Sequence, residues 1–362
     1  MKVVSFDPTG LPAENQVRFL SESGQGLFQS PEWASAKARD GWRPWGLAAM
    51  DGETICASII ALERRFPGGL SPFGGIWHAP RGPVANFEST TGRDGAAALL
   101  EALEALVRRR GGTVIRISPD VEAGTFPAGW LEGLGYRPAI GAPWMHTATF
   151  RVDLAREEES ILGGMEGRVR SAIRKARRAG IRIDAAKDPA SFGVFYAMHR
   201  ATGDRNAFSV ISGNRMQRIW EESARGGWGR VFLSRSPGGE PLSGAFVLAP
   251  GRRCHYLFGA STPLCRKHHA NELLHWEAMK WARKRGCDSY DLEGVAGRLS
   301  PGHPLWGNYL FKRGFGGRYV ELAGEYERVL RPRLHRILAW GVARLRAGPP
   351  PLKREKQVVH HA

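Results

Sequence analysis

Two adjacent cations, Lys312 and Arg313, stand between two phenylalanines and are followed by glycines in the segment FKRGFGG, residues 311–317. A cation beside large apolar side chains acts on a neighbouring oxyanion with a stronger field than it would have in water. The glycines allow a substrate backbone or phosphate to approach closely. The segment is therefore a candidate for oxyanion stabilisation or phosphate binding; the alternative is a glycine-capped helix end with an exposed Lys-Arg pair.

A second cationic segment, residues 168–182, contains seven basic residues and no acidic one. They are Arg168, Arg170, Arg174, Lys175, Arg177, Arg178 and Arg182. Spacings of three and four place several of them on one side of a helix. A solvated helix face normally carries both signs of charge, so a stripe of one sign favours a polyanionic ligand and phosphate contacts that do not depend on sequence.

The composition points the same way. Lysine and arginine total 52 against 35 acidic residues, giving a formal charge of +17 and a pI near 10.3. This charge suggests that the protein binds nucleic acid, a phosphorylated substrate or an anionic lipid surface. The alternative is a high-GC genome, which favours arginine and would also raise the net charge. The four cysteines show no C-x-x-C spacing and no histidine has metal-ligand spacing, so we expect neither a disulfide framework nor a metal, and a reducing cytoplasm.

Residues 1–152 are expected to form a first α/β unit. The stretch 43–62 has the pattern of two strands joined by a turn at Asp51-Gly52, and residues 94–110 have helical spacing and end before Gly111. The start of the chain lacks the apolar core of a signal peptide, and no apolar run is long enough to span a bilayer.

Residues 153–321 are expected to form a second unit with the same order of helices, antiparallel strands, helix and strand. A helix is predicted over residues 322–347, with apolar residues on one face and arginines opposite. Packing on the first unit is the favoured use, and an anionic membrane surface is the alternative. The proline-broken, charged residues 348–362 are predicted to be disordered.

Several sequence blocks occur in an order that resembles one family. They read SPEWASAKARDGW, HAPRGPV, EGRVRSAIRKARRAG, ATGDRNAF, NELLHWEAMKWARKRGCDSYDLEGV and YLFKRGFGG, over roughly residues 28–325. Together they resemble the FemABX family of aminoacyl-tRNA-dependent peptidyl transferases, which add amino acids to peptidoglycan precursors. The resemblance implies an α/β (α+β) fold of two tandem GNAT-like (acyl-CoA N-acyltransferase-like) domains. The chain lacks the heptads of a coiled-coil arm.

The resemblance also implies roles for individual residues. Lys312 matches the position held to stabilise the transition state, with Phe311 beside it. Lys37 and Arg205 match positions that bind the diphosphate of the precursor, and Tyr256 matches an aromatic position around the acceptor peptide, although burial in the core is nearly as plausible. Arg81 lies in a proline-flanked turn and suits either substrate contact or packing. The stripe of one sign described above suits the phosphates of a tRNA, which predicts a tRNA site at Arg168, Arg170, Arg174, Lys175, Arg177 and Arg178.

These observations predict a monomeric, cytoplasmic transferase, with a peripheral contact at the inner face of the membrane left open. It would join an amino acid to the peptide stem of a UDP-linked or lipid-linked muropeptide, with aminoacyl-tRNA as donor and no cofactor. One alternative is an acyl-CoA-dependent N-acyltransferase. The loop CRKHHANELL lacks the glycine that usually lets backbone N–H groups hold a pyrophosphate. The other alternative is a non-catalytic basic protein that binds nucleic acid or membrane.

Overall fold

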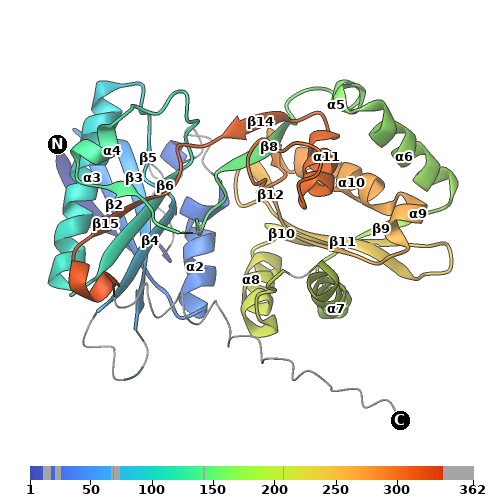
Figure 1. Cartoon of the computed structure of the whole chain (residues 1–362), viewed down its shortest axis with the longest axis horizontal. Helices are drawn as coiled ribbons and strands as arrows, with labels where there is room; N and C mark the ends of the chain where they lie inside the picture. Colours follow the sequence, from blue (N-terminus) through green and yellow to red (C-terminus); the bar gives the residue numbers. More distant parts are fainter. Residues whose placement is uncertain are drawn as a thin grey trace, which may run out of the picture.

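Two mixed β-sheets with helices packed on them lie side by side in the computed structural model (Figure 1). The structure describes residues 1–10, 18–20, 26–66, 68, 74–141, 143–206 and 208–336. None of the helices in these ranges has the length and apolar character needed to cross a membrane.

The first sheet has the strand order β1-β2-β3-β4-β6-β15-β7, with β5 paired to β3. The strands are β1 (Lys2–Phe6), β2 (Arg43–Asp51), β3 (Thr54–Arg65), β4 (Gly75–Arg81), β5 (Val84–Ala85), β6 (Val114–Pro119), β7 (Arg137–Pro138) and β15 (Tyr326–Val329). The predicted hairpin is confirmed, because β2 and β3 pair antiparallel and meet at Asp51 and Thr54.

Helices pack against this first sheet. They are the 3-10 helix η1 (Leu27–Gln29), α2 (Pro31–Arg39), α3 (Thr90–Arg109) and α4 (Trp130–Gly133). The helix predicted over 94–110 is α3, which starts four residues earlier because the Ser89 side chain caps it by accepting a hydrogen bond from the Gly92 N–H. Leu99, Leu103 and Val107 are buried on its sheet-facing side.

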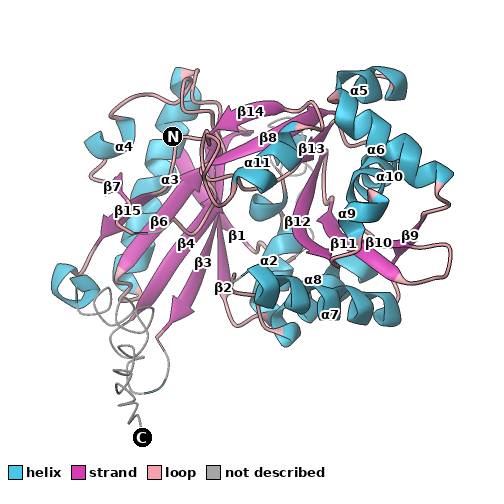
Figure 2. Cartoon of the chain, turned by 45° about the vertical axis from the view of Figure 1, so that its right-hand side comes forward, coloured by secondary structure: helices cyan, strands magenta, loops and turns pink. Residues whose placement is uncertain are grey.

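The second sheet has the order β14-β8-β13-β12-β11-β10-β9. Its strands are β8 (Ala148–Asp153), β9 (Arg182–Ala186), β10 (Gly229–Arg235), β11 (Pro241–Leu248), β12 (Arg253–Ser261), β13 (Ser289–Asp291) and β14 (Arg318–Glu321). Its helices are α5 (Glu158–Gly164), α6 (Gly167–Arg178), α7 (Pro189–Asn206), α8 (Gly213–Arg225), α9 (Cys265–His268), α10 (Ala270–Lys284) and α11 (Trp306–Arg313), arranged on both faces of the sheet (Figure 2).

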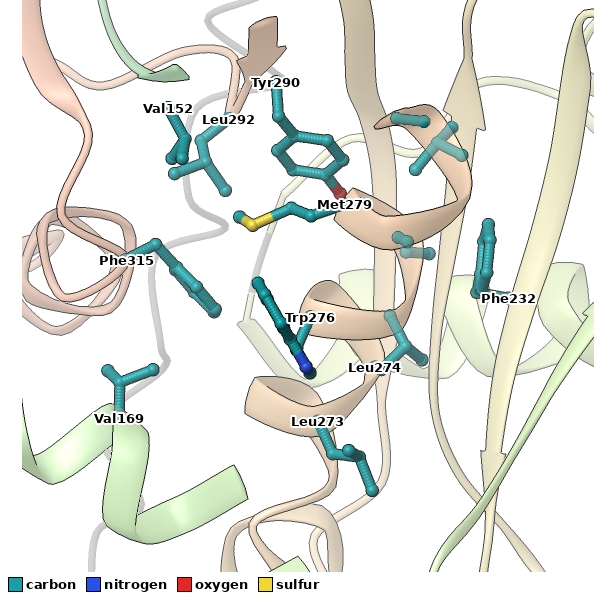
Figure 3. Close-up of a cluster of buried hydrophobic side chains, with 14 of the residues drawn as sticks. Val152, Val169, Phe232, Leu273, Leu274, Trp276, Met279, Tyr290, Leu292 and Phe315 are labelled. Carbon is teal, nitrogen blue, oxygen red and sulfur yellow. The ribbon is translucent and has the colours of Figure 1, made fainter. Parts of the chain in front are cut away.

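The core of the second unit surrounds α10. Trp276 and Met279 point from this helix toward Phe315, and all three are buried (Figure 3). The helices α5 and α6 are separated at Met165, whose backbone is extended. The two glycines before Met165 explain the break, since glycine is unfavourable within a helix.

Two segments differ from the predicted division of the chain. Strand β8 was assigned almost entirely to the first unit, but it lies in the second sheet between β13 and β14. The segment 322–347 was predicted to contain only helix, and this is wrong for β15, which pairs antiparallel with β6. The two strands also share a buried ion pair, in which Arg116 binds Glu327 at 3.1 Å. Residues 337–347 and the predicted disordered tail 348–362 lie outside the described residues.

Candidate active site

Lys312 lies near the end of α11 and is only 6% exposed. Its ammonium donates hydrogen bonds to two backbone carbonyl oxygens, Glu293 O at 3.0 Å and Gly294 O at 2.7 Å. An ammonium has three N–H groups, so these contacts leave one for a substrate atom. The sequence-based expectation of a shielded charge is consistent with this geometry.

Burial governs the titration of this lysine. Desolvation lowers the pKa of Lys312 to about 8, and the negative charges of Glu293 and Asp291 oppose that decrease. A lysine with this pKa is still mainly cationic at neutral pH. It can therefore supply a positive charge in a dry site, where such a charge stabilises an oxyanion far better than in water.

A pocket of about 690 Å³ opens beside α11 and brings together several residues predicted from the sequence. Its lining includes Arg168, Arg205, Tyr256 and Phe311, with further polar groups from the loop before α10. The Lys312 Nζ lies 6.0 Å from the centre of the Tyr256 ring. Tyr256 and Phe311, the residue before Lys312, thus line the pocket close to the buried ammonium.

Two of these lining residues are fixed by local contacts. Arg205, in the last turn of α7, donates to the Ser261 carbonyl at 2.7 Å and to the Ser261 hydroxyl at 3.2 Å. The hydroxyl of Tyr256 rests against Gly259, where any Cβ would lie 1.9 Å from it, so only glycine fits. The His275 ring meets the Tyr256 ring edge-on at 4.3 Å. Tyr256 is therefore half-buried and forms the wall of the pocket.

Lys37 does not line this pocket. It lies on α2, where its ammonium binds Asp40 at 3.1 Å and sits 5.6 and 5.5 Å from the ring centres of Trp33 and Trp42. Desolvation lowers the pKa of Lys37, and the attraction of Asp40 only partly offsets it. Asp40 also binds Arg215 of α8, which joins the two units. Lys37 and Arg205 thus have different direct partners, and only Arg205 lines this pocket.

Arg81 ends β4 and is also outside the pocket. It is 8% exposed, and its backbone is in the left-handed region with a φ of 59°. The N–H of Arg81 donates to the Ser118 hydroxyl at 3.2 Å. Sequence analysis left substrate contact and packing equally open for Arg81, and its burial favours packing.

Six of the seven cations of the basic segment lie on α6, and the seventh, Arg182, begins β9. Arg168 reaches the Leu310 carbonyl and Arg170 reaches the Met165 carbonyl, so both are engaged within the fold. Arg177 pairs with Glu277 at 3.1 Å. The other three cations, Arg174, Lys175 and Arg178, are exposed and make no hydrogen bond or ion pair with the described part of the chain. They remain available to an external anion.

Sequence analysis missed a buried polar cluster next to Lys312. His255, Asp291 and Glu293 place potential metal-ligand atoms within 4.8 Å of one another. These atoms are already engaged: His255 Nδ1 is bonded to Glu293 Oε1 at 2.6 Å, and the two Asp291 oxygens accept from Thr149, Arg151 and the Glu293 N–H. The cluster is therefore a hydrogen-bonded network. The only sequence signal was the pair of acids in the strand-end segment DLEG.

Comparisons with known proteins agree with this architecture. A model of the acetyltransferase (GNAT) domain matches residues 165–313. The chain is 21% identical to a lipid II:glycine glycyltransferase of Staphylococcus saprophyticus over 88% of this chain and 92% of that protein. It is 22% identical to a lipid II:glycine glycyltransferase of Staphylococcus aureus over 86% and 90% of the two chains.

Solved structures show the same fold. The crystal structure of FemX aligns with a TM-score of 0.79 at 20% identity, covering 93% of this chain and 100% of that one. A tandem GNAT protein from the clavulanic acid biosynthesis pathway aligns with a TM-score of 0.52 at 12% identity, covering 91% and 98%. The predicted tandem GNAT-like fold and the resemblance to FemABX proteins are thereby confirmed.

Proposed function

We propose that this chain is an aminoacyltransferase that forms a peptide bond between an amino acid and an amine on the peptide stem of a lipid-linked peptidoglycan precursor. The observation that carries the proposal is the buried ammonium of Lys312, with one free N–H, beside the pocket lined by Arg205, Tyr256 and Phe311. The relatives named lipid II:glycine glycyltransferases support the acceptor class.

The donor we propose is an aminoacyl-tRNA ester. The stem amine attacks the ester carbonyl carbon, a C–N bond forms, and the carbonyl oxygen becomes an oxyanion. Lys312 donates its remaining N–H to that oxygen. Collapse of the intermediate breaks the C–O bond to the terminal ribose; the ribose hydroxyl leaves with a proton and the new amide loses the amine proton. The ester is already activated, so positioning and one charge suffice.

Arg205 and Arg168 supply positive charge to the pocket and suit the diphosphate of the acceptor. The resemblance assigns Lys37 to the same diphosphate, but its ammonium is engaged by Asp40. We therefore give Arg205 the main anchoring role. With a lipid-linked acceptor, the protein would work in the cytoplasm at the inner face of the membrane, and we propose that it does so as a monomer.

Arg174, Lys175 and Arg178 suit the phosphates of the tRNA. Replacing all three with glutamine should weaken tRNA binding and reduce the salt dependence of the affinity, by a slope of roughly 0.9 per lost contact with duplex phosphate. Filter binding of charged tRNA from 50 to 300 mM salt would measure this. Replacing Arg109, Arg137 and Arg333 of the first unit in the same way is the matched control. An unchanged slope in the α6 variant would remove this surface from the tRNA site.

An acyl-CoA donor remains the rival for this fold. The pocket reaches the start of α10, where a pyrophosphate would bind backbone N–H groups. Glu272 stands in that first turn and lines the pocket, so its carboxylate would repel the phosphates. His269, before the helix, has a bulky side chain at a φ of 52°. These features favour an aminoacyl ester over CoA.

The test is a reaction of the purified protein with a mixed pool of charged tRNAs and lipid-linked or UDP-linked muropeptides, followed by mass spectrometry. We expect the acceptor mass to rise by one aminoacyl residue, and we expect the product to be lost when ribonuclease is added at the start. Parallel reactions contain acetyl-CoA and no tRNA. Product formation that survives ribonuclease, or that requires CoA, would overturn the donor assignment.

A further inference from the structure

The two carbonyls that hold Lys312 belong to a turn with an unusual backbone. Glu293 follows β13 and has a φ of 54°, in the left-handed region that a residue with a side chain rarely adopts. The Asp291 Oδ1 accepts a hydrogen bond from the Glu293 N–H at 2.8 Å and so fixes the turn from one side. A costly backbone conformation beside a reacting group persists only when its surroundings determine it.

The Glu293 side chain fixes the turn from the other side. Its Oε1 lies 2.6 Å from His255 Nδ1, and His255 Nε2 accepts from the Leu27 N–H at 3.2 Å. Because Nε2 is an acceptor, Nδ1 carries the proton and donates it to the carboxylate. Gly26 lies against this ring, where an added Cβ would come within 2.2 Å of Nε2. The imidazole is thus held at both nitrogens.

We infer that Glu293 and His255 are positioning residues for Lys312. Their hydrogen bond fixes the turn that presents two carbonyls to the ammonium, and the Glu293 carboxylate adds a negative charge that keeps the ammonium protonated. The link to Leu27 ties this arrangement to the start of the first unit. The inference rests on the proposed function, in which Lys312 acts as a cation.

The charged and titratable groups around Lys312 come from several elements. They are Asp291 at the end of β13, Glu293 after it, Tyr256 of β12, His275 of α10 and His146 before β8. Only Asp291 and Glu293 raise the pKa of Lys312. Asp291 is already paired with Arg151, so Glu293 is the group to replace.

Glu293→Gln keeps an oxygen that can accept from His255 and removes only the charge. The ammonium form of Lys312 should then be lost at lower pH. Burial lowers the pKa of Lys312 to about 8, so we expect kcat of the parent protein to fall as the pH rises through that value. In Glu293→Gln this descending limb should move down by about one unit, the size expected for loss of a nearby opposite charge. Rates at pH 6 should agree within about twofold. Asp288→Asn is the matched control, because this half-buried residue just before β13 also loses a charge but pairs with Arg252 and not with Lys312.

Glu293→Asp separates the effect of the negative charge from the effect of the hydrogen bond to His255. It keeps the charge and tolerates the left-handed backbone, but its shorter side chain cannot reach His255 in the same geometry. We expect kcat to fall about tenfold with the descending limb unmoved, because a misplaced ammonium loses alignment with the oxyanion. Equal loss at all pH values in Glu293→Gln, with no displaced limb, would overturn the inference.

A direct titration distinguishes failure of this inference from failure of the proposed function. The chain has ten lysines, so the resonance that disappears in Lys312→Met identifies Lys312 in protein labelled with 13C at lysine Cε. Its pKa should be lower in Glu293→Gln than in the parent. If the pKa shifts but Lys312→Met retains full activity, the proposed function fails and the positioning stands. If the pKa of Lys312 is the same in Glu293→Gln as in the parent, the inferred positioning role of Glu293 is wrong.

Discussion

Lys312→Met should lower kcat by about a hundredfold or more, the loss measured when one donor to an oxyanion is removed from an active site. Methionine matches the length and shape of the buried lysine and fits an apolar wall, so the fold should tolerate the exchange. The change removes the charge and the one N–H that the carbonyls of Glu293 and Gly294 leave free. The measurement is single-turnover transfer from charged tRNA, with tRNA affinity determined in parallel.

Lys284→Met is the control for this change, because Lys284 is exposed on α10 and lies outside the pocket. It should leave kcat unchanged. Affinity for charged tRNA should be nearly the same in Lys312→Met as in the parent, since one buried ammonium contributes little to binding along a nucleic acid. Full turnover in Lys312→Met would show that the oxyanion is stabilised elsewhere.

Asp120→Ala should lower the free energy of unfolding by about 3–5 kcal/mol, because it leaves buried positive charge without its partner. Asp120 follows β6 in the first unit and binds Arg151 and Arg253 of the second, with all three side chains at most 15% exposed. Burial alone would raise the pKa of Asp120, but the two arginines outweigh that effect and hold it well below its usual range.

Urea denaturation at pH 7 would measure this loss. Glu122→Ala breaks a much more exposed pair with Arg318 two residues along the chain, and it should cost less than about 1 kcal/mol. Since the pKa of Asp120 is lowered by folding, its contribution is complete above about pH 4, the unfolded value, and is lost as the pH falls below it. Equal effects of both substitutions would show that the buried pair does not join the units energetically.

Local signals in the sequence predicted the elements that depend on neighbouring residues. The Asp51-Gly52 turn located the hairpin, and the apolar spacing before Gly111 located α3. Strand β15 was missed because it is four residues long and its partner β6 lies about 200 positions earlier, so nothing nearby in the chain indicates the pairing.

For the candidate site too, the sequence indicated contiguous residues but not contacts between residues far apart in the chain. Lys312 and Phe311 could be singled out because cation, aromatic rings and glycines are contiguous in FKRGFGG, and the family resemblance then gave Lys312 its expected role. The partners of Lys312 could not be singled out, because the role of Glu293 depends on a positive φ and on contacts with His255, 38 residues away, and through it Leu27, 228 residues from His255. Lys37 was matched by position, but its burial between Trp33 and Trp42 could be seen only in three dimensions.

The return of the chain to the first sheet through β15 determines which unit can complete its fold first while the protein is being translated. The N-terminal half of the molecule has an open edge at β6, with Arg116 uncompensated, until Glu325 and Glu327 have left the ribosome. The second unit has all its strands once residue 321 has been translated. It can therefore fold while the first unit still lacks its last strand, β15. During translation, domains usually fold in order from the N-terminus. In this protein the second unit would complete its fold before the first.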